Sequence, residues 1–403
     1  MSTTAKKSFL SQRGSNIEPS VTMEVTALAN QLKAEGKPVI GLSAGEPDFD
    51  TPDYIKEAGI QSIKEGHTKY TAVSGMPKLL QSISNKLKRD HHLNYDPHQI
   101  VVSCGAKHSI FNVMMAIINP GDEVIIPQPY WVSYPNQVSL AGGVPVFIET
   151  DDSSNFKITP EQLESAITPA TKMVILNSPS NPTGMVYTKD ELSALAEVII
   201  SHNILVLSDE IYEKLIYDGE HVSIASFSPE IKDLTILING ASKAYSMTGW
   251  RVGYTAAPLD IAKVMGKIQS HSTSNAATPA QFASLEAFDR DDTVVDSMRD
   301  SFHKRRDLMV DQLNEIPGIT CLKPNGAFYA FPNISSFFGK KSESGDITDS
   351  VSFCKYFLKE KLVACVPGSG FGSEGYIRMS YAVSVEDINK ALSLLDEWVR
   401  SLK

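Results

Sequence analysis

Three polar residues stand at regular spacing, each shortly after an apolar run that is typical of a buried strand. Asn181 follows the run KMVILN by a short turn, Asp209 follows ILVLS, and Lys243 follows LTILI. The runs recur about every thirty residues, which is the length of a right-handed strand-helix-strand unit. Because the carboxyl ends of parallel strands meet at one edge of a sheet, we expect an amide, a carboxylate and an amine to share a crevice there.

Each of these residues also has an ordinary structural explanation. Asn-Pro-Thr-Gly is a common turn, an aspartate after a strand caps a helix, and a single lysine is usually solvated. Together they favour chemistry, because a lysine amine forms a Schiff base with an aldehyde and a carboxylate keeps a pyridine nitrogen protonated. The combination predicts a site for an aromatic aldehyde cofactor.

The elements that must position these residues alternate short apolar runs with amphipathic segments of helix length, which indicates an α/β fold. A helix is predicted after the turn at Gly105, and Thr188 with Glu191 predicts a capping box at the start of another. Strands are predicted at 100–103, 123–126, 173–177, 204–208 and 234–238.

Length and composition bound the class of protein. At 403 residues the chain exceeds the ~250–300 residues at which one core stops growing, so we expect a large domain and a smaller one. The net charge of −10 argues against nucleic acid or an anionic membrane as a partner. Four scattered cysteines indicate reduced thiols and a cytoplasmic protein. The N-terminal residues lack the apolar region of a secretory signal, and a short organelle transit segment is the alternative.

Four motifs resemble those of the class I, fold-type I pyridoxal-phosphate aminotransferases: SPSNPTG, SDEIYEKLIYDG, SKAYSMTGWRVGY and YIRMSYA. Four more, SAGEPDFDTP, TKYTAVSG, PYWVSYP and the GAK turn, are similar to the bacterial and plastid aspartate/prephenate aminotransferase subgroup. The resemblance runs from about residue 13 to the C-terminus. It implies a large domain at 50–300 with a mostly parallel seven-stranded sheet between helices. A smaller α/β domain at 301–403 would be completed by residues 1–49, which form an N-terminal arm.

The resemblance also implies a role for each cofactor residue. Lys243 would bind the aldehyde of pyridoxal 5′-phosphate and later act as the base, and Asp209 would pair with its pyridine nitrogen. Tyr212 and Asn181 would hydrogen-bond the phenolate oxygen of the ring, and Trp131 would stack on its face.

The cofactor phosphate needs its own site. The turn SCGAK begins a helix directly after a strand, so the N–H groups of Gly105, Ala106 and Lys107 are predicted to be free to bind an anion. By resemblance, Arg251 adds a bidentate contact, and Tyr70 reaches the phosphate from the other subunit of a homodimer.

One departure from the family pattern lies next to the lysine. The family often has serine three residues before the lysine, where this chain has Gly240. Ser242, directly before the lysine, is the candidate to compensate by contacting the cofactor.

The substrate residues follow from the same resemblance. Arg378 would hold the α-carboxylate together with Gly45 and Asn181. The chain has no arginine between Arg251 and Arg290, so the distal carboxylate would fall to Lys107, helped by Ser20. The implied substrates are aspartate, glutamate, oxaloacetate and 2-oxoglutarate. A lysine discriminates shape less strictly than an arginine fork, which leaves room for prephenate.

Several alternatives stay open at this point. A β-lyase would use the same lysine and carboxylate, and a regulatory module of the same fold would need a DNA-binding arm, for which only about 50 residues precede the large domain. GSGFG at 368–372 is expected to be a turn of the small domain, not a dinucleotide loop. We expect no metal, because His91 and His92 lie in a polar stretch that is typical of solvated surface.

Overall fold

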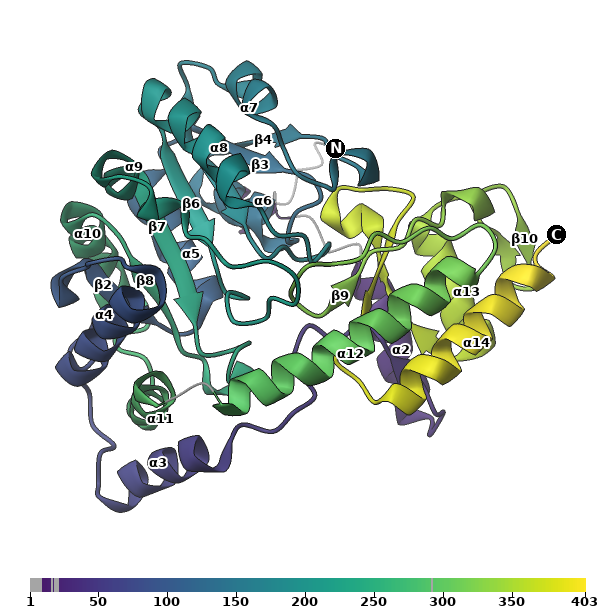
Figure 1. The fold of residues 1–403 in the computed structure, drawn as a ribbon, viewed down its shortest axis with the longest axis horizontal. Helices are drawn as coiled ribbons and strands as arrows, with labels where there is room; N and C mark the ends of the chain where they lie inside the picture. Colours follow the sequence, from purple (N-terminus) through teal and green to yellow (C-terminus); the bar gives the residue numbers. More distant parts are fainter. Residues whose placement is uncertain (1–8, 16, 18–21, 291–292) are drawn as a thin grey trace, which may run out of the picture.

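A seven-stranded sheet organises the larger part of the chain (Figure 1). The computed structural model describes residues 9–15, 17, 22–290 and 293–403. In spatial order the strands are β2 (Ile100–Ser103), β8 (Gly253–Ala256), β7 (Thr235–Gly240), β6 (Leu205–Asp209), β5 (Thr171–Asn177), β3 (Glu123–Pro127) and β4 (Val144–Ile148). Neighbours are parallel except at β8, which is antiparallel to both β2 and β7. The predicted α/β class and mostly parallel sheet are confirmed.

Helices cover both faces of this sheet because successive side chains of a strand point to opposite faces. Ile125 packs with one apolar cluster, whereas its neighbours Val124 and Ile126 pack with another. The helices of this part are α3 (Asp53–Lys64), α4 (Pro77–His91), α5 (Ala106–Ile117), α6 (Ser133–Ala141), α7 (Pro160–Ala166), α8 (Lys189–His202), α9 (Pro229–Leu234), α10 (Leu259–Ser270) and α11 (Thr278–Asp289). Thr188 and Glu191 form the predicted capping box at the start of α8.

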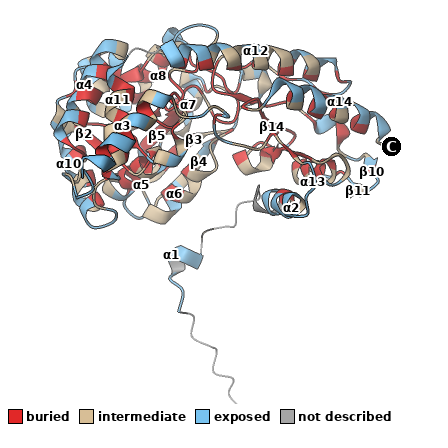
Figure 2. Cartoon of the chain, turned by 90° about the horizontal axis from the view of Figure 1, so that it is seen from below, coloured by how far each residue is buried: buried red, intermediate tan, exposed pale blue. Residues whose placement is uncertain are grey.

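The smaller part packs helices around short strands and a core of its own. Its main sheet has the order β13-β14-β9, and β1 pairs with β12. Its strands are β1 (Ile40–Gly41), β9 (Tyr329–Ala330), β10 (Lys341–Ser342), β11 (Gly345–Asp346), β12 (Val363–Ala364), β13 (Val366–Pro367) and β14 (Ile377–Ser380). Its helices are α2 (Thr22–Ala34), α13 (Ser350–Lys361) and α14 (Val385–Ser401), and α1 (Gln12–Ser15) precedes them in the chain. Buried residues fill the interior of both parts (Figure 2).

The long helix α12 (Thr293–Glu315) runs from one part to the other (Figure 1). Val295 and Met298, near its start, pack in a core cluster of the larger part, whereas Phe302 and Met309 pack in the core of the smaller one. The domain boundary that we propose near residue 300 therefore falls within this helix.

The structure also bears on the predicted strand ends, the cysteines and the GSGFG segment. Strand β6 includes Asp209 and β7 continues to Gly240, so both strands run slightly further than the apolar pattern predicts. All four cysteines are free thiols, and the GSGFG segment forms a short 3₁₀ turn. Among the described residues, none of the helices is both long enough and apolar enough to cross a membrane.

Candidate active site

The carboxyl ends of β5, β6 and β7 meet at one edge of the large sheet. Asn177 ends β5 and is the register partner of Asp209, which ends β6. Lys243 follows three residues after the end of β7. Asn181, Asp209 and Lys243 line one cavity of about 480 Å³. The structure therefore brings these three residues together, as the strand spacing predicts.

Asp209 is a buried carboxylate that the protein holds on both oxygens. Tyr134 donates its hydroxyl to Oδ2 at 2.7 Å, and the Ile211 N–H donates to Oδ1 at 3.3 Å. Burial raises the pKa of Asp209 to about 6, against the lowering effect of the Tyr134 hydrogen bond. Because little water stabilises this carboxylate, a cationic partner in the cavity would stabilise its charged form strongly.

Lys243 projects its amine into the same cavity. Its Nζ donates to the Gly45 carbonyl at 2.6 Å. Burial, together with the positive charge of Arg378, lowers the pKa of Lys243 to about 8. The amine is therefore neutral in a usable fraction of molecules near neutral pH, which a nucleophile or base requires.

Arg378 supplies a buried guanidinium on β14, from the smaller part of the chain. Its Nη1 donates to Asn181 Oδ1 at 2.9 Å, and its Nη2 donates to the Ser43 carbonyl at 3.0 Å. Its Nε is buried without a hydrogen-bond partner among the described residues. The guanidinium also lies 4.4 Å from the ring centroid of Tyr329. A planar cation with an unused donor at a cavity wall suits a carboxylate ligand.

The start of α5 forms a corner of the site where an anion can bind. The N–H groups of Ala106 and Lys107 have no hydrogen-bond acceptor among the described residues. The prediction that the Gly105 N–H is also free is wrong, because it donates to the Ser103 carbonyl at 2.7 Å. Gly105 has φ of +89°, and a Cβ there would lie 2.4 Å from Arg251 Nη2. The glycine therefore lets the arginine approach the helix start.

Lys107 and Trp131 form one wall at the mouth of the cavity. Lys107 Nζ lies 4.9 Å from the centroid of the Trp131 ring. Partial removal from water and the nearby charge of Arg251 both lower the pKa of Lys107. Trp131 is half-buried and meets Tyr134 edge to face, with ring centroids 5.3 Å apart.

The remaining predicted residues divide into two groups. Gly45, Ser242 and Tyr212 line the cavity, and the Tyr212 hydroxyl lies 2.9 Å from that of Tyr329. Tyr70 does not line it and is 88% exposed. Ser20 lies outside the described residues.

Several residues that the sequence did not single out also line this site, and three of them contact the predicted ones. Asn177 lines the cavity and donates to the Asp209 carbonyl at 2.9 Å, and the rule that located Asp209 at a strand end also applies to it. Tyr134 lies three residues after Trp131, about one helical turn further along the motif PYWVSYP. Phe371 lines the cavity 5.1 Å from Arg378, and no local pattern signals it.

This fold and site define a family. The family model "Aminotransferase class I and II" matches residues 37–395, and the chain belongs to that family. It is 50% identical to the aspartate aminotransferase of Geobacillus stearothermophilus, over 97% of this chain and 99% of that one. It is 48% identical to the aspartate/prephenate aminotransferase of Cereibacter sphaeroides, over 98% and 99% of the two chains.

Solved structures agree with the sequence relatives. The aspartate aminotransferase from Rhizobium meliloti superposes with a TM-score of 0.95 at 44% identity, covering 98% of this chain and 99% of that one. The aspartate aminotransferase from Thermus thermophilus with maleate has a TM-score of 0.91 at 40% identity, covering 97% and 100%. The predicted resemblance is confirmed, and with it the dependence on pyridoxal 5′-phosphate.

The residues of this chain fit that cofactor. Asp209 offers a buried carboxylate to a pyridinium nitrogen, Lys243 offers an amine to the aldehyde, and the start of α5 with Arg251 offers donors to the phosphate. These groups belong to one cavity. Their chemical types are those that the three reactive parts of the cofactor require.

Proposed function

We propose that this chain transfers an amino group between aspartate or glutamate and a 2-oxo acid, with oxaloacetate and 2-oxoglutarate as the oxo-acid partners. The observation that carries the proposal is the convergence of Lys243, Asp209 and Arg378 on one cavity. Relatives about half identical over nearly their whole length bear the name aspartate aminotransferase. The bound cofactor supplies an electron sink that makes the substrate Cα proton acidic.

Each residue then has a defined task. Lys243 takes a proton from the substrate Cα and returns it, which its lowered pKa permits near neutral pH. With the cofactor bound, Asp209 would keep its pyridine nitrogen protonated, and Tyr212 and Asn181 would donate to its ring oxygen. Trp131 would contact its ring. Ser242 would contact the cofactor from the lysine loop.

Substrate selection divides between two cations. Arg378 binds the α-carboxylate, with Gly45 and Asn181 beside it, since its Nε is buried and without a partner in the described chain. Lys107 binds the distal carboxylate from the mouth of the cavity, together with Ser20. The Thermus thermophilus relative was solved with maleate, a dicarboxylate, which supports a site for two carboxylates. Prephenate is a further substrate that the names of relatives support.

We infer that the active form is a homodimer in which Tyr70 serves the neighbouring subunit. Support comes from its 88% exposure and from its position outside the cavity of its own chain. Hybrid dimers of a Tyr70→Phe chain with a Lys243→Ala chain should regain one intact site of two. No recovery of activity above that of the Tyr70→Phe dimer after mixing and reassembly would contradict the shared site.

The cellular setting is part of the same proposal. We place the protein in the cytoplasm, without nucleic-acid or membrane partners. Four free thiols, three of them buried, and the acidic net charge support this setting.

One half-reaction tests the reaction type. Holoenzyme mixed with aspartate should convert its cofactor to pyridoxamine phosphate and release oxaloacetate. A β-lyase would instead convert cysteine to pyruvate and sulfide, and a regulatory module would bind amino acids without turnover. Borohydride reduction should attach the cofactor to Lys243, and Lys243→Ala should abolish the attachment. Labelling of a different lysine would contradict the assignment.

A further inference from the structure

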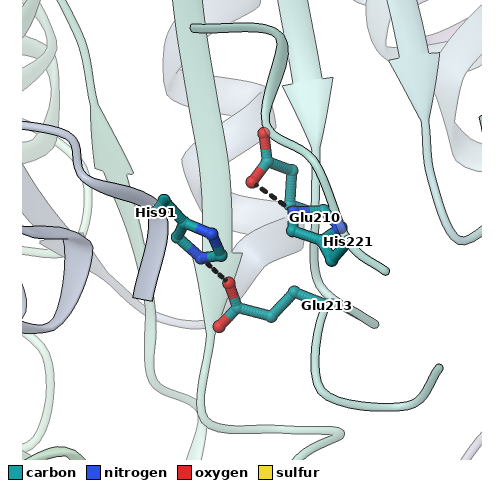
Figure 3. A group of neighbouring side chains, drawn as sticks. All are labelled: His91, Glu210, Glu213 and His221. Carbon is teal, nitrogen blue, oxygen red and sulfur yellow. Dashed lines mark hydrogen bonds and ion pairs between the residues drawn. The ribbon is translucent and has the colours of Figure 1, made fainter. Parts of the chain in front are cut away.

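A second cluster of ionisable side chains contacts the segment that carries Asp209 and Tyr212. We call it the ionic cluster, and it consists of Lys86, Asp90, His91, Glu210, Glu213, Lys214 and His221. Figure 3 shows His91 at the end of a helix, facing Glu213, and His221 facing Glu210. The prediction that His91 is solvated is wrong, because its side chain is only 7% exposed. His92 is exposed, as predicted.

The segment 209–213 alternates between the active site and the ionic cluster. Asp209 and Tyr212 line the cavity, whereas Glu210 and Glu213 do not and contact the cluster instead. The backbone fixes this alternation, because the Glu210 N–H donates to the Ile238 carbonyl and the Glu213 N–H donates to the Glu210 carbonyl, both at 2.9 Å. A shift of Glu210 would therefore move Asp209, and a shift of Glu213 would move Tyr212, because each glutamate directly follows that residue in the chain.

Both glutamates are held on both of their oxygens. Glu213 contacts Lys86 through Oε1 and His91 through Oε2. Glu210 accepts from the hydroxyls of Ser208 at 2.9 Å and Ser223 at 2.6 Å through Oε1. Its Oε2 lies 2.9 Å from His221 Nε2.

The charges of the ionic cluster balance when one histidine carries a proton. Asp90, Glu210 and Glu213 are negative, and Lys86 and Lys214 are positive, with Lys214 Nζ 2.9 Å from Asp90 Oδ2. Arg89 also contacts Asp90, but its side chain is 46% exposed and water screens it. One buried negative charge is therefore left for a histidinium to cancel.

The geometry favours His91 as the histidine that carries this proton. The Nδ1 of His221 is buried without a hydrogen-bond partner among the described residues, so a second proton on that ring would have no acceptor beyond the contact of Nε2 with Glu210. His91 contacts Glu213, and the negative charge of Glu213 raises the pKa of His91 against the effect of burial.

A divalent metal is the competing occupant of the ionic cluster. One ligand atom from each of the two histidines and two glutamates lies within 4.8 Å of the others, and two nitrogens with two oxygens suit zinc. However, the Lys86 ammonium already contacts Glu213. A divalent ion would convert the single excess negative charge into an excess positive one. The observations therefore favour the proton.

We propose that His91, acting through Glu213, is a positioning residue for Asp209 and Tyr212. By holding Glu213 with Lys86, it fixes the turn whose neighbouring residues contact the cofactor. This inference rests on the proposed cofactor roles of Asp209 and Tyr212. It assigns no contact between His91 and substrate, so substrate binding at Arg378 should not depend on it.

The test compares two variants of His91 with a control for general destabilisation. His91→Leu removes both the charge and the hydrogen bond, whereas His91→Gln keeps a donor. Ile199→Val shortens a buried side chain of α8 without touching the 209–213 segment. For each holoenzyme we would measure kcat and KM for aspartate, and for each apo-protein the dissociation constant of pyridoxal phosphate and the melting temperature.

We expect His91→Leu to lower kcat about ten- to hundredfold, as a misplaced catalytic group does, with KM for aspartate within about twofold of wild type. The cofactor dissociation constant should rise in the same variant, and His91→Gln should fall between it and wild type. Ile199→Val should lower only the melting temperature. Equal kcat values for His91→Leu and Ile199→Val would overturn the inference. So would stoichiometric metal in the purified protein whose removal by a chelator weakens cofactor binding.

Asp209→Ala separates this inference from the proposed function. Unchanged cofactor binding in Asp209→Ala would refute the proposed role of Asp209 itself. Weaker binding in Asp209→Ala, together with unchanged binding in His91→Leu, would refute only the positioning role of His91.

Discussion

Tyr134 donates its hydroxyl to Asp209 Oδ2 at 2.7 Å, so the carboxylate of the candidate active site has a fixed orientation before any ligand binds. The contact joins α6, on one face of the sheet, to the end of β6. In the described part of the chain, this hydroxyl and the Ile211 N–H are the two hydrogen-bond donors that stabilise the charged form of the buried Asp209. The charged form is the one that can pair with a pyridinium.

Tyr134→Phe should therefore weaken cofactor binding. A hydrogen bond to a charged group is worth about 1.5–3 kcal/mol, which corresponds to about ten- to hundredfold in the dissociation constant. Titration of the apo-protein with pyridoxal phosphate measures the effect. Tyr95→Phe is the matched control, because the Tyr95 hydroxyl is buried and has no hydrogen-bond partner among the described residues. Equal cofactor affinity in the two variants would show that the Tyr134 hydroxyl does not contribute to cofactor binding.

The lowered pKa of Lys243 makes a second prediction, on stability against pH. The folded apo-protein holds this group at a pKa of about 8, below its ordinary value of 10.5. Between these values the unfolded chain binds a proton that the folded chain lacks, so the stability of the folded state rises with pH. Below pH 8 the cost of burying the charge is present in full.

Lys243→Met removes this titration while keeping an unbranched side chain. The melting temperature of the wild-type apo-protein, relative to that of Lys243→Met, should therefore rise from pH 8 to 10. Other titrating groups are common to both proteins and cancel in the difference. If the melting temperatures of the two proteins changed with pH in the same way across this range, Lys243 would have its ordinary pKa in the folded protein.

Strand periodicity predicted the positions that β5, β6 and β7 deliver to the sheet edge, because a strand's register decides where its last side chain lies. It did not predict Tyr134, whose importance depends on how α6 packs across the sheet against Asp209. Nor could it predict His91, because the partner of that side chain is Glu213, 122 residues later in the chain. A polar neighbourhood in sequence resembles a solvated surface until the fold supplies such a partner.

The phosphate corner shows a similar limit on a smaller scale. The strand-turn-helix pattern correctly predicts where α5 begins. It does not predict that Gly105 turns so tightly that its N–H returns to the Ser103 carbonyl. That detail depends on the positive φ of Gly105, which the sequence permits but does not specify.

The departure from the family pattern at Gly240 has a steric basis that can be tested. A Cβ at Gly240 would lie 2.8 Å from the Val252 carbonyl oxygen and 2.9 Å from the Gly253 Cα, which are both backbone atoms at the start of the neighbouring strand β8. Gly240→Ser should destabilise the apo-protein by about 1–3 kcal/mol, as overpacking does. Gly249→Ser is the control, because a Cβ there meets nothing within 4 Å. Urea unfolding measures both, and equal stability would show that the backbone at Gly240 yields freely.

The last prediction concerns the two cations that the proposed function assigns to the two carboxylates of the substrate. Every amino acid has an α-carboxylate, so Arg378→Lys should reduce kcat/KM for aspartate and for alanine alike. Lysine keeps the charge but loses the planar donors that contact Asn181 and Ser43. Only acidic substrates have a distal carboxylate, so Lys107→Ala should reduce kcat/KM for aspartate and leave alanine nearly unchanged.

Each loss should be about ten- to hundredfold, since a charge-assisted contact is worth about 1.5–3 kcal/mol. All measurements are made at saturating cofactor, because Lys107 stands at the helix start that is proposed to bind the phosphate. If Lys107 only supported the phosphate, Lys107→Ala would weaken cofactor binding and affect both substrates equally. An equal loss for aspartate and alanine in Lys107→Ala would therefore refute its role in specificity, while the Arg378→Lys result would still test the α-carboxylate site on its own.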